Sequence, residues 1–215
     1  MAEEIVAGRE LKVVFDARRC IHSRHCVLLH PEVFVPNVSG EWIHPDRASA
    51  AAVVEVAHRC PSGAIRYRPV DARLAPEAPP QVNTVSVREN GPLALHADLE
   101  LAGEDTGFRA TLCRCGQSAR KPYCDGAHAR SGFSASGEPA TAESAALAQR
   151  AGPLVVKALE NGPLELKGNV ELVSGTGRTL NRLSKTYLCR CGQSRNKPYC
   201  DGSHQAAGFR AAALP

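Results

Sequence analysis

The chain has 215 residues, of which 43% are hydrophobic and 22% charged, with a formal net charge of +4. This length allows one or two folded domains. Aromatic residues make up 5%, so each core must be small and aliphatic. The modest, dispersed positive charge argues against nucleic acid as the main partner. No window is apolar enough to cross a bilayer, which argues against a membrane partner.

Nine cysteines are spread along the chain as three groups of three. An odd count cannot pair off completely, which disfavours a secreted disulfide framework. The start, Met-Ala-Glu-Glu, is acidic and lacks the basic region and apolar stretch of a secretory signal. We therefore expect a soluble protein of a reducing compartment, namely a cytoplasmic one.

The first unit is expected to cover residues 1–70. Residues 11–15 alternate weakly and predict a strand, as do residues 64–68, which alternate apolar and basic side chains. The Ala- and Val-rich residues 49–58, with Asp46 before them, predict a helix. Residues 71–80 contain three prolines and little apolar content, so they are predicted to be a linker.

The rest of the chain is a tandem repeat, over residues 81–136 and 154–215, joined by a linker over 137–153. Residues 89–95 match 160–166, and 98–101 match 169–172. Asn-Gly between alternating apolar residues predicts that each repeat opens with antiparallel strands. A third strand, over 109–112 or 185–188, leads to the first cysteine of its repeat. The Ala-rich residues 140–151 are predicted to form a short helix.

Each repeat carries the motif C-x-C-x8-C-x3-H, with nearly the same intervening residues. A helix that begins at Asp125, the expected N-cap, would place Cys124 and His128 on one face. Three thiolates and one imidazole suit either a tetrahedral zinc ion or a [2Fe–2S] cluster. The C-x-C pair favours the cluster, because zinc sites prefer C-x2-4-C pairs. The motif residues are Cys113, Cys115, Cys124 and His128 in the first repeat, and Cys189, Cys191, Cys200 and His204 in the second.

The run Cys-Asp-Gly-Ser-His from Cys200 to His204, with Cys189-Arg-Cys191 and Lys-Pro-Tyr before it, resembles the CDGSH iron–sulfur (mitoNEET-like) family. The first copy has Ala127 in place of the serine. The resemblance covers about the last 135 residues and implies two [2Fe–2S] clusters, each on the three cysteines and one histidine of a motif. A single-motif form of the family works as a homodimer with a membrane anchor. Two copies in one chain without an anchor imply a monomer with an internal, pseudo-twofold dimer.

Five basic residues lie near the motifs: Arg114, Lys121, Arg190, Arg195 and Lys197. They are either a solvated surface or an electrostatic device. In the second case, cations beside anionic clusters would raise the reduction potential and orient an acidic redox partner.

In the first unit, Cys20 and Cys26, followed by Cys60-Pro-Ser-Gly-Ala, are similar to the divergent single-cluster ferredoxin-like domains over roughly residues 10–68. Ser23 stands at the vacant cysteine position. The three thiolates could hold a [3Fe–4S] cluster, or a [4Fe–4S] cluster whose fourth iron takes Ser23, His22, His25 or water. A domain that has kept the fold and lost its cluster is the alternative.

Together these features predict an α+β protein in which a small ferredoxin-like domain precedes two β-rich CDGSH repeats. The expected function is non-enzymatic electron transfer to or from a redox protein, because the chain carries no nucleophile–base pair, phosphate loop or dinucleotide fingerprint. Cluster storage, transfer to a cluster-acceptor protein or redox sensing is a second possibility. A zinc-stabilised interaction module is a third.

Overall fold

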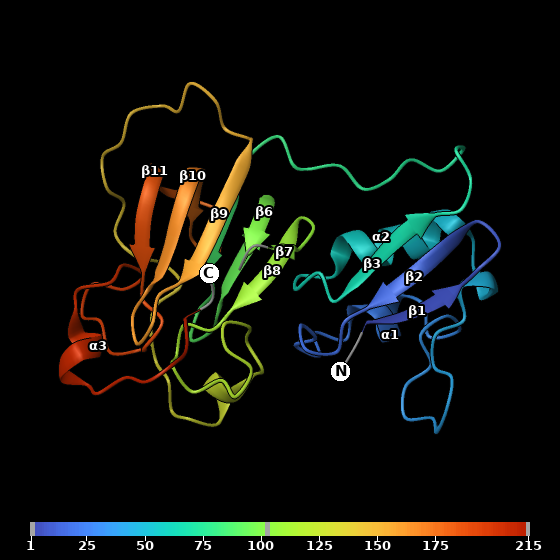
Figure 1. The fold of residues 1–215 in the computed structure, drawn as a ribbon, viewed down its shortest axis with the longest axis horizontal. Coiled ribbons are helices and arrows are strands. Elements are labelled where there is room, and N and C mark those ends of the chain that lie inside the picture. Colours follow the sequence, from blue (N-terminus) through green and yellow to red (C-terminus); the bar gives the residue numbers. More distant parts are fainter. Residues whose placement is uncertain (1–2, 102–103, 214–215) are drawn as a thin grey trace. The chain divides into compact units, whose positions relative to one another are not determined.

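The computed structural model of the chain describes residues 3–101 and 104–213. They form two compact units, unit 1 (Met1–Ala78) and unit 2 (Pro79–Pro215). Unit 1 combines strands and helices, whereas unit 2 is mostly β structure with few helices (Figure 1). Among the described residues, no helix combines the length and the apolar content that crossing a membrane requires.

Unit 1 is a three-stranded antiparallel sheet with two α-helices. Its elements are β1 (Glu4–Ala7), β2 (Leu11–Phe15), α1 (His25–Leu29), the short 3-10 helix η1 (Pro45–Arg47), α2 (Ala50–Arg59) and β3 (Ile65–Pro69), with the strand order β1-β2-β3. The predicted strand over 11–15 is confirmed. The predicted helix over 49–58 begins one residue later, because Ser49 is the N-cap and its hydroxyl accepts a hydrogen bond from Ala52 N.

Helix α2 buries Val53, Val56 and Ala57 in the core of unit 1, beside residues of β2 and β3. The large side chains of this core include Phe34, which is fully buried, and Trp42 at its edge. The remaining core residues are mostly aliphatic, as the low aromatic content predicts.

Unit 2 contains one extended sheet to which both repeats contribute. The first repeat supplies β4 (Thr84–Val87), β5 (Leu93–His96), β6 (Asp98–Leu101), β7 (Glu104–Asp105) and β8 (Arg109–Leu112), and the second supplies β9 (Pro153–Ala158), β10 (Leu164–Val173) and β11 (Thr179–Leu188). The strand order is β7-β6-β9-β10-β4-β5-β8, with β11 paired to β10. The predicted opening hairpins are confirmed as β4–β5 and β9–β10, with Asn90 and Asn161 at positive φ in their turns.

The repeats exchange strands with one another. Strand β6 of the first repeat runs parallel to β9 of the second, and β10 runs parallel to β4. Glu100 pairs with Val155, and Glu171, at the corresponding position of the second repeat, pairs with Thr84. The two parallel contacts therefore have the same register.

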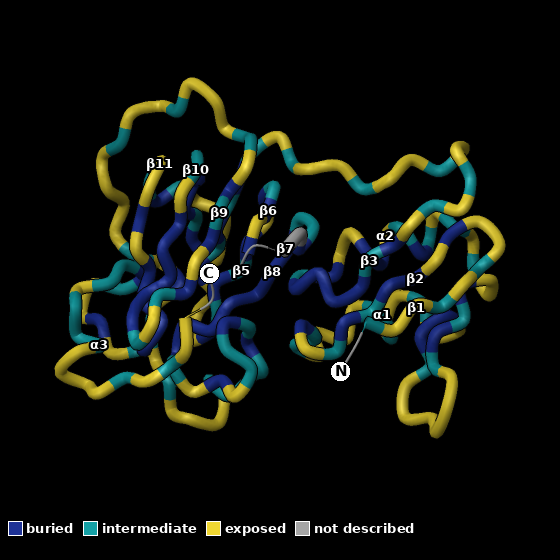
Figure 2. Tube along the Cα trace, viewed as in Figure 1, coloured by how far each residue is buried: buried dark blue, intermediate teal, exposed yellow. Residues whose placement is uncertain are grey.

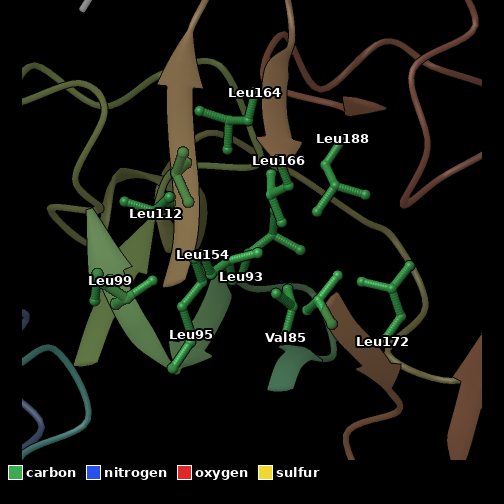
Figure 3. Packing of buried hydrophobic residues seen from close by; sticks show 14 of the residues in the cluster. Val85, Leu93, Leu95, Leu99, Leu112, Leu154, Leu164, Leu166, Leu172 and Leu188 are labelled. Atoms are coloured by element: carbon green, nitrogen blue, oxygen red, sulfur yellow. The ribbon is translucent and has the colours of Figure 1, made fainter. Parts of the chain in front are cut away.

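The strand exchange buries one continuous aliphatic core between the repeats. Figure 3 shows side chains of both repeats meeting in it, among them Leu93 and Leu112 of the first and Leu154 and Leu166 of the second. These four leucines are at most 1% exposed. Each repeat therefore completes the core of the other.

The predicted helix over residues 140–151 is wrong. The segment is irregular and largely exposed (Figures 1 and 2). It lies along β11, where Ala142 N donates to Leu180 O and Ser144 Oγ accepts from Arg182 N. A helix of this length with no buried apolar face is only marginally stable, so these hydrogen bonds prevail over the helix propensity of alanine.

Candidate metal centres

In the first repeat, β8 leads directly into Cys113 and Cys115. Both cysteines are buried, and their Sγ atoms lie 3.7 Å apart. The chain then loops back to β8, where Cys113 N donates to Pro122 O and Cys124 N donates to Thr111 O. This short antiparallel contact, centred on Leu112 and Tyr123, brings the third cysteine beside the first pair.

Cys124 and His128 form a second pair, with Sγ and Nδ1 3.4 Å apart. The predicted helix from Asp125 is shorter than expected. It is the 3-10 turn η2 (Ala127–Ala129), and its N-cap is Gly126, at φ 81°. The Asp125 carboxylate accepts hydrogen bonds from Ala127 N and from Ala119 N, so it clamps the turn to the preceding loop.

The second repeat reproduces this geometry. The Sγ atoms of Cys189 and Cys191 are 3.8 Å apart, and Cys200 Sγ lies 3.4 Å from His204 Nδ1. Asp201 accepts from Ser203 N and Arg195 N, and helix α3 (Ser203–Ala206) carries the histidine. In both motifs the sequence-predicted donors thus come together as two pairs. Within residues 3–101 and 104–213, no three His, Cys, Asp or Glu side chains converge on a single metal-ion position.

The surroundings of the first motif shift the pKa values of its donors in both directions. A hydrogen bond from the Cys115 thiol holds the pKa of Cys113 below the ordinary thiol value. The hydrogen bond with Cys113 raises the pKa of Cys115, and burial raises that of Cys124. Cys115 Sγ accepts a hydrogen bond from Gln117 N, and Cys124 Sγ accepts one from Gly126 N. Burial lowers the pKa of His128, so the imidazole is neutral near pH 7, as a metal ligand must be.

Arg114 and Arg190, between the paired cysteines, are buried, so a solvated surface is the wrong interpretation for these two residues. Arg114 donates to the carbonyl oxygens of Arg88, Gly91, Ala135 and Ser136. It thereby ties the β4–β5 turn and the end of the repeat to the C-x-C pair. Arg190 donates to the carbonyl oxygens of Leu159 and Ala212 in the same way.

The two motif loops lie against each other. Gly116, at φ 80°, packs on the backbone of Cys191, and Gly192, also at φ 80°, packs on that of Cys115. Sequence reasoning assigned no role to these glycines. Their presence after the second cysteine of both copies was the available signal.

In unit 1, the structure brings Cys20, Cys26 and Cys60 to the wall of one cavity of about 800 Å³. The pKa of Cys26 is raised by burial and by the neighbouring Cys60 and Cys20. Cys60 Sγ accepts a hydrogen bond from Ile65 N, and Cys20 Sγ accepts one from His22 N. His22, Ser23 and His25 line the same cavity.

Comparisons with known proteins agree with these sites. Residues 90–129 and 161–205 match the family described as iron-binding zinc finger, CDGSH type. Residues 6–69 match the family described as divergent 4Fe-4S mono-cluster. Two uncharacterized proteins named YjdI, from Escherichia coli strains K12 and O157:H7, are each 40% identical over 62 residues, or 28% of this chain and 79% of theirs.

The motifs and the matches define an iron–sulfur protein. It belongs to the CDGSH family, in a form with two CDGSH segments preceded by a divergent 4Fe-4S mono-cluster domain.

The donor sets fit such clusters. Thiolates and imidazole are ligands that iron accepts, and backbone N–H groups directed at the sulfurs are typical of iron–sulfur sites. Each CDGSH motif supplies these ligands as two pairs, one of two cysteines and one of a cysteine and a histidine.

Proposed function

We propose that this protein is a non-enzymatic electron carrier with two [2Fe–2S] clusters, each held by three cysteines and one histidine. The observation that carries the proposal is the arrangement of each motif's donors as two close pairs. Cys113 with Cys115 would hold one iron, and Cys124 with His128 the other, with the equivalent division in the second repeat. A bound cluster of this type supplies a group that accepts and returns one electron.

The paired arrangement supports a dinuclear cluster over zinc. A structural zinc ion needs all four ligands directed at one point. In a [2Fe–2S] cluster each iron takes only two protein ligands, so two separate pairs suffice. The zinc-stabilised interaction module is therefore the weaker alternative. Metal analysis and colour decide between them, because zinc sites are colourless.

The two repeats are proposed to pack as a pseudo-twofold intramolecular dimer. The equal register of β6 with β9 and of β10 with β4 supports this, as do the reciprocal contacts of Gly116 and Gly192. These contacts keep the two C-x-C pairs close together, which suits two redox centres that act jointly.

Unit 1 is proposed to hold a third cluster, [3Fe–4S] or [4Fe–4S], in a ferredoxin-like domain. Its support is the convergence of Cys20, Cys26 and Cys60 on one cavity, with hydrogen bonds to two of the sulfurs. A third centre suits a carrier, since it adds an electron site without adding a substrate site.

The proposed partner is a redox protein with an acidic surface, because Arg195 is an exposed cation beside the second motif and Lys197 is half-buried there. All nine cysteines are free, which suits a reducing compartment such as the cytoplasm.

Electron paramagnetic resonance (EPR) of anaerobically prepared protein, before and after dithionite, tests the proposal. Oxidised [2Fe–2S] clusters give no EPR signal and should give one on reduction. Chemical analysis should find iron and sulfide in nearly equal amounts. Reversible reduction and reoxidation without loss of iron would support the carrier. A colourless protein that contains zinc would refute it.

Cluster delivery is the second candidate. It is favoured by the partial exposure of Cys200, whereas the equivalent Cys124 is buried. Incubation with an apo-ferredoxin distinguishes the two functions. Transfer of iron and sulfide to the acceptor would support delivery, and rapid reduction of the acceptor's own cluster without transfer would support the carrier.

A further inference from the structure

The three thiols of unit 1 leave one corner of a four-iron cluster without a cysteine. His22, Ser23 and His25 all line the cavity that contains these thiols. The spacing in the sequence puts Ser23 at the vacant position. The structure distinguishes the three by their hydrogen bonds.

His25 is held in the form that a metal ligand requires. Its Nδ1 lies 3.1 Å from the carbonyl oxygen of Arg59. A carbonyl only accepts hydrogen bonds, so Nδ1 must carry the proton. In the neutral ring, Nε2 then has the free lone pair. Metal-binding histidines commonly donate their second ring N–H to a backbone carbonyl in this way, which fixes the ring and the tautomer.

The same hydrogen bond joins the two ends of the site. His25 begins α1 and precedes Cys26, while Arg59 ends α2 and precedes Cys60. The imidazole is therefore tied between the chain segments that supply two of the three thiols.

The other two candidates fit the vacant corner less well. The backbone N of His22 lies 3.4 Å and its Nδ1 3.9 Å from Cys20 Sγ. Two donors that close suit a single iron, as in the CDGSH motifs, whereas each iron of a [4Fe–4S] cluster takes one protein ligand, so His22 is poorly placed for the corner that the cysteines leave vacant. Ser23 offers a hydroxyl group, and iron in sulfur-rich sites prefers thiolate or imidazole to a neutral oxygen.

We propose that His25 Nε2 is the fourth protein ligand of a [4Fe–4S] cluster in unit 1, beside Cys20, Cys26 and Cys60. This proposal rests on the proposed function, because it requires that unit 1 holds a cluster. It distinguishes a complete four-ligand site from a three-thiolate site that carries only [3Fe–4S].

Pulsed EPR of the reduced full chain tests the proposal. The two CDGSH histidines would also give nitrogen couplings, so the experiment uses a His128→Cys, His204→Cys background. In that background, a reduced S = 1/2 centre of unit 1 should show hyperfine coupling to an imidazole nitrogen. Labelling with ¹⁵N-histidine should replace the ¹⁴N pattern, which includes quadrupole splitting, with the simpler pattern of a spin-1/2 nucleus. His25→Ala should abolish it.

Two further variants control for position and for folding. His22→Ala is matched in residue type and lies in the same loop, and it should leave the coupling unchanged. His25→Cys should retain a [4Fe–4S] cluster without nitrogen coupling, since it supplies a fourth thiolate. His25→Ala should also favour a [3Fe–4S] signal in the oxidised protein, because the unique iron loses its protein ligand.

The outcomes separate the two levels of the proposal. A unit 1 cluster whose nitrogen coupling is absent, or survives in His25→Ala, overturns the role of His25 and leaves the third cluster standing. Wild-type protein with about four irons per chain and no unit 1 signal overturns the third cluster, and His25 with it.

Discussion

Gly116 packs so closely on Cys191 that a Cβ atom at Gly116 would lie 2.4 Å from the Cys191 carbonyl oxygen. The same distance separates a Cβ at Gly192 from the Cys115 carbonyl oxygen. Each motif loop therefore packs directly on the backbone that carries a cysteine of the other motif. A substitution in one loop should therefore disturb the ligands of both centres.

Gly116→Ala should destabilise unit 2 and weaken cluster retention at both CDGSH motifs. The positive φ costs about 1–2 kcal/mol for alanine, and the backbone clash adds about 1–3 kcal/mol. Gly177→Ala is the matched control, because Gly177 also has positive φ but a Cβ atom there would have no neighbour within 4 Å among the described residues. Chemical unfolding and cluster absorbance measure the effects. Equal losses in both variants would contradict the close contact.

Arg114→Lys should destabilise unit 2 more than Arg190→Lys. A lysine ammonium cannot reproduce the planar guanidinium that reaches four carbonyl oxygens around Arg114, so a loss of about 2–3 kcal/mol is expected. Within the part of the chain that the structure describes, Arg190 donates to two carbonyl oxygens and its buried Nε has no hydrogen-bond partner. Denaturant unfolding of both variants gives the comparison, and the reverse order would refute this account.

Asn83→Ala should cost about 2–4 kcal/mol of stability. Asn83 is completely buried where the repeats meet, and its Nδ2 donates to Gly152 O and Asn169 O while its Oδ1 accepts from Asp98 N. Asn83→Asp should be no better, since its carboxylate would face the two carbonyl oxygens. Asn181→Ala is the control and should lose about 1 kcal/mol, because Asn181 is only half-buried, where it donates to Tyr199 Oη and accepts from the adjacent Arg182 N. Thermal unfolding ranks the three.

Glu171→Gln should destabilise the protein at pH 7 and much less in acid. Hydrogen bonding from Arg150 lowers the pKa of Glu171, whose side chain is 3% exposed. A carboxylate with a lowered folded-state pKa stabilises the fold above its unfolded pKa of about 4.3, and this contribution disappears as pH falls through the folded value. The pH dependence of the unfolding free energy checks this. Glu100→Gln, at the equivalent but exposed position of the first repeat, should change the stability and its pH dependence little.

Patterns that are local in the sequence predicted the structure well. Strand β2 alternates, α2 has a serine N-cap, and the motif spacing gives the donor pairs. Features that depend on distant partners were not predictable. Strand β1 is mostly exposed and has no clear alternation, so only its pairing with β2 defines it. The burial of Arg114 depends on carbonyl oxygens that the fold brings from residues 88–91 and 135–136.

Replacing both His128 and His204 with cysteine should keep both [2Fe–2S] clusters and lower their reduction potentials. A thiolate can take the place of the imidazole in each Cys–His pair, and its negative charge disfavours the reduced state, since histidine ligation raises the potential of such clusters. Protein-film voltammetry measures the shift, and absorbance with iron analysis measures retention. His44→Cys, outside both motifs, is the control and should leave the potentials unchanged. Unchanged potentials in the double variant, with both clusters intact, would show that neither histidine is a ligand.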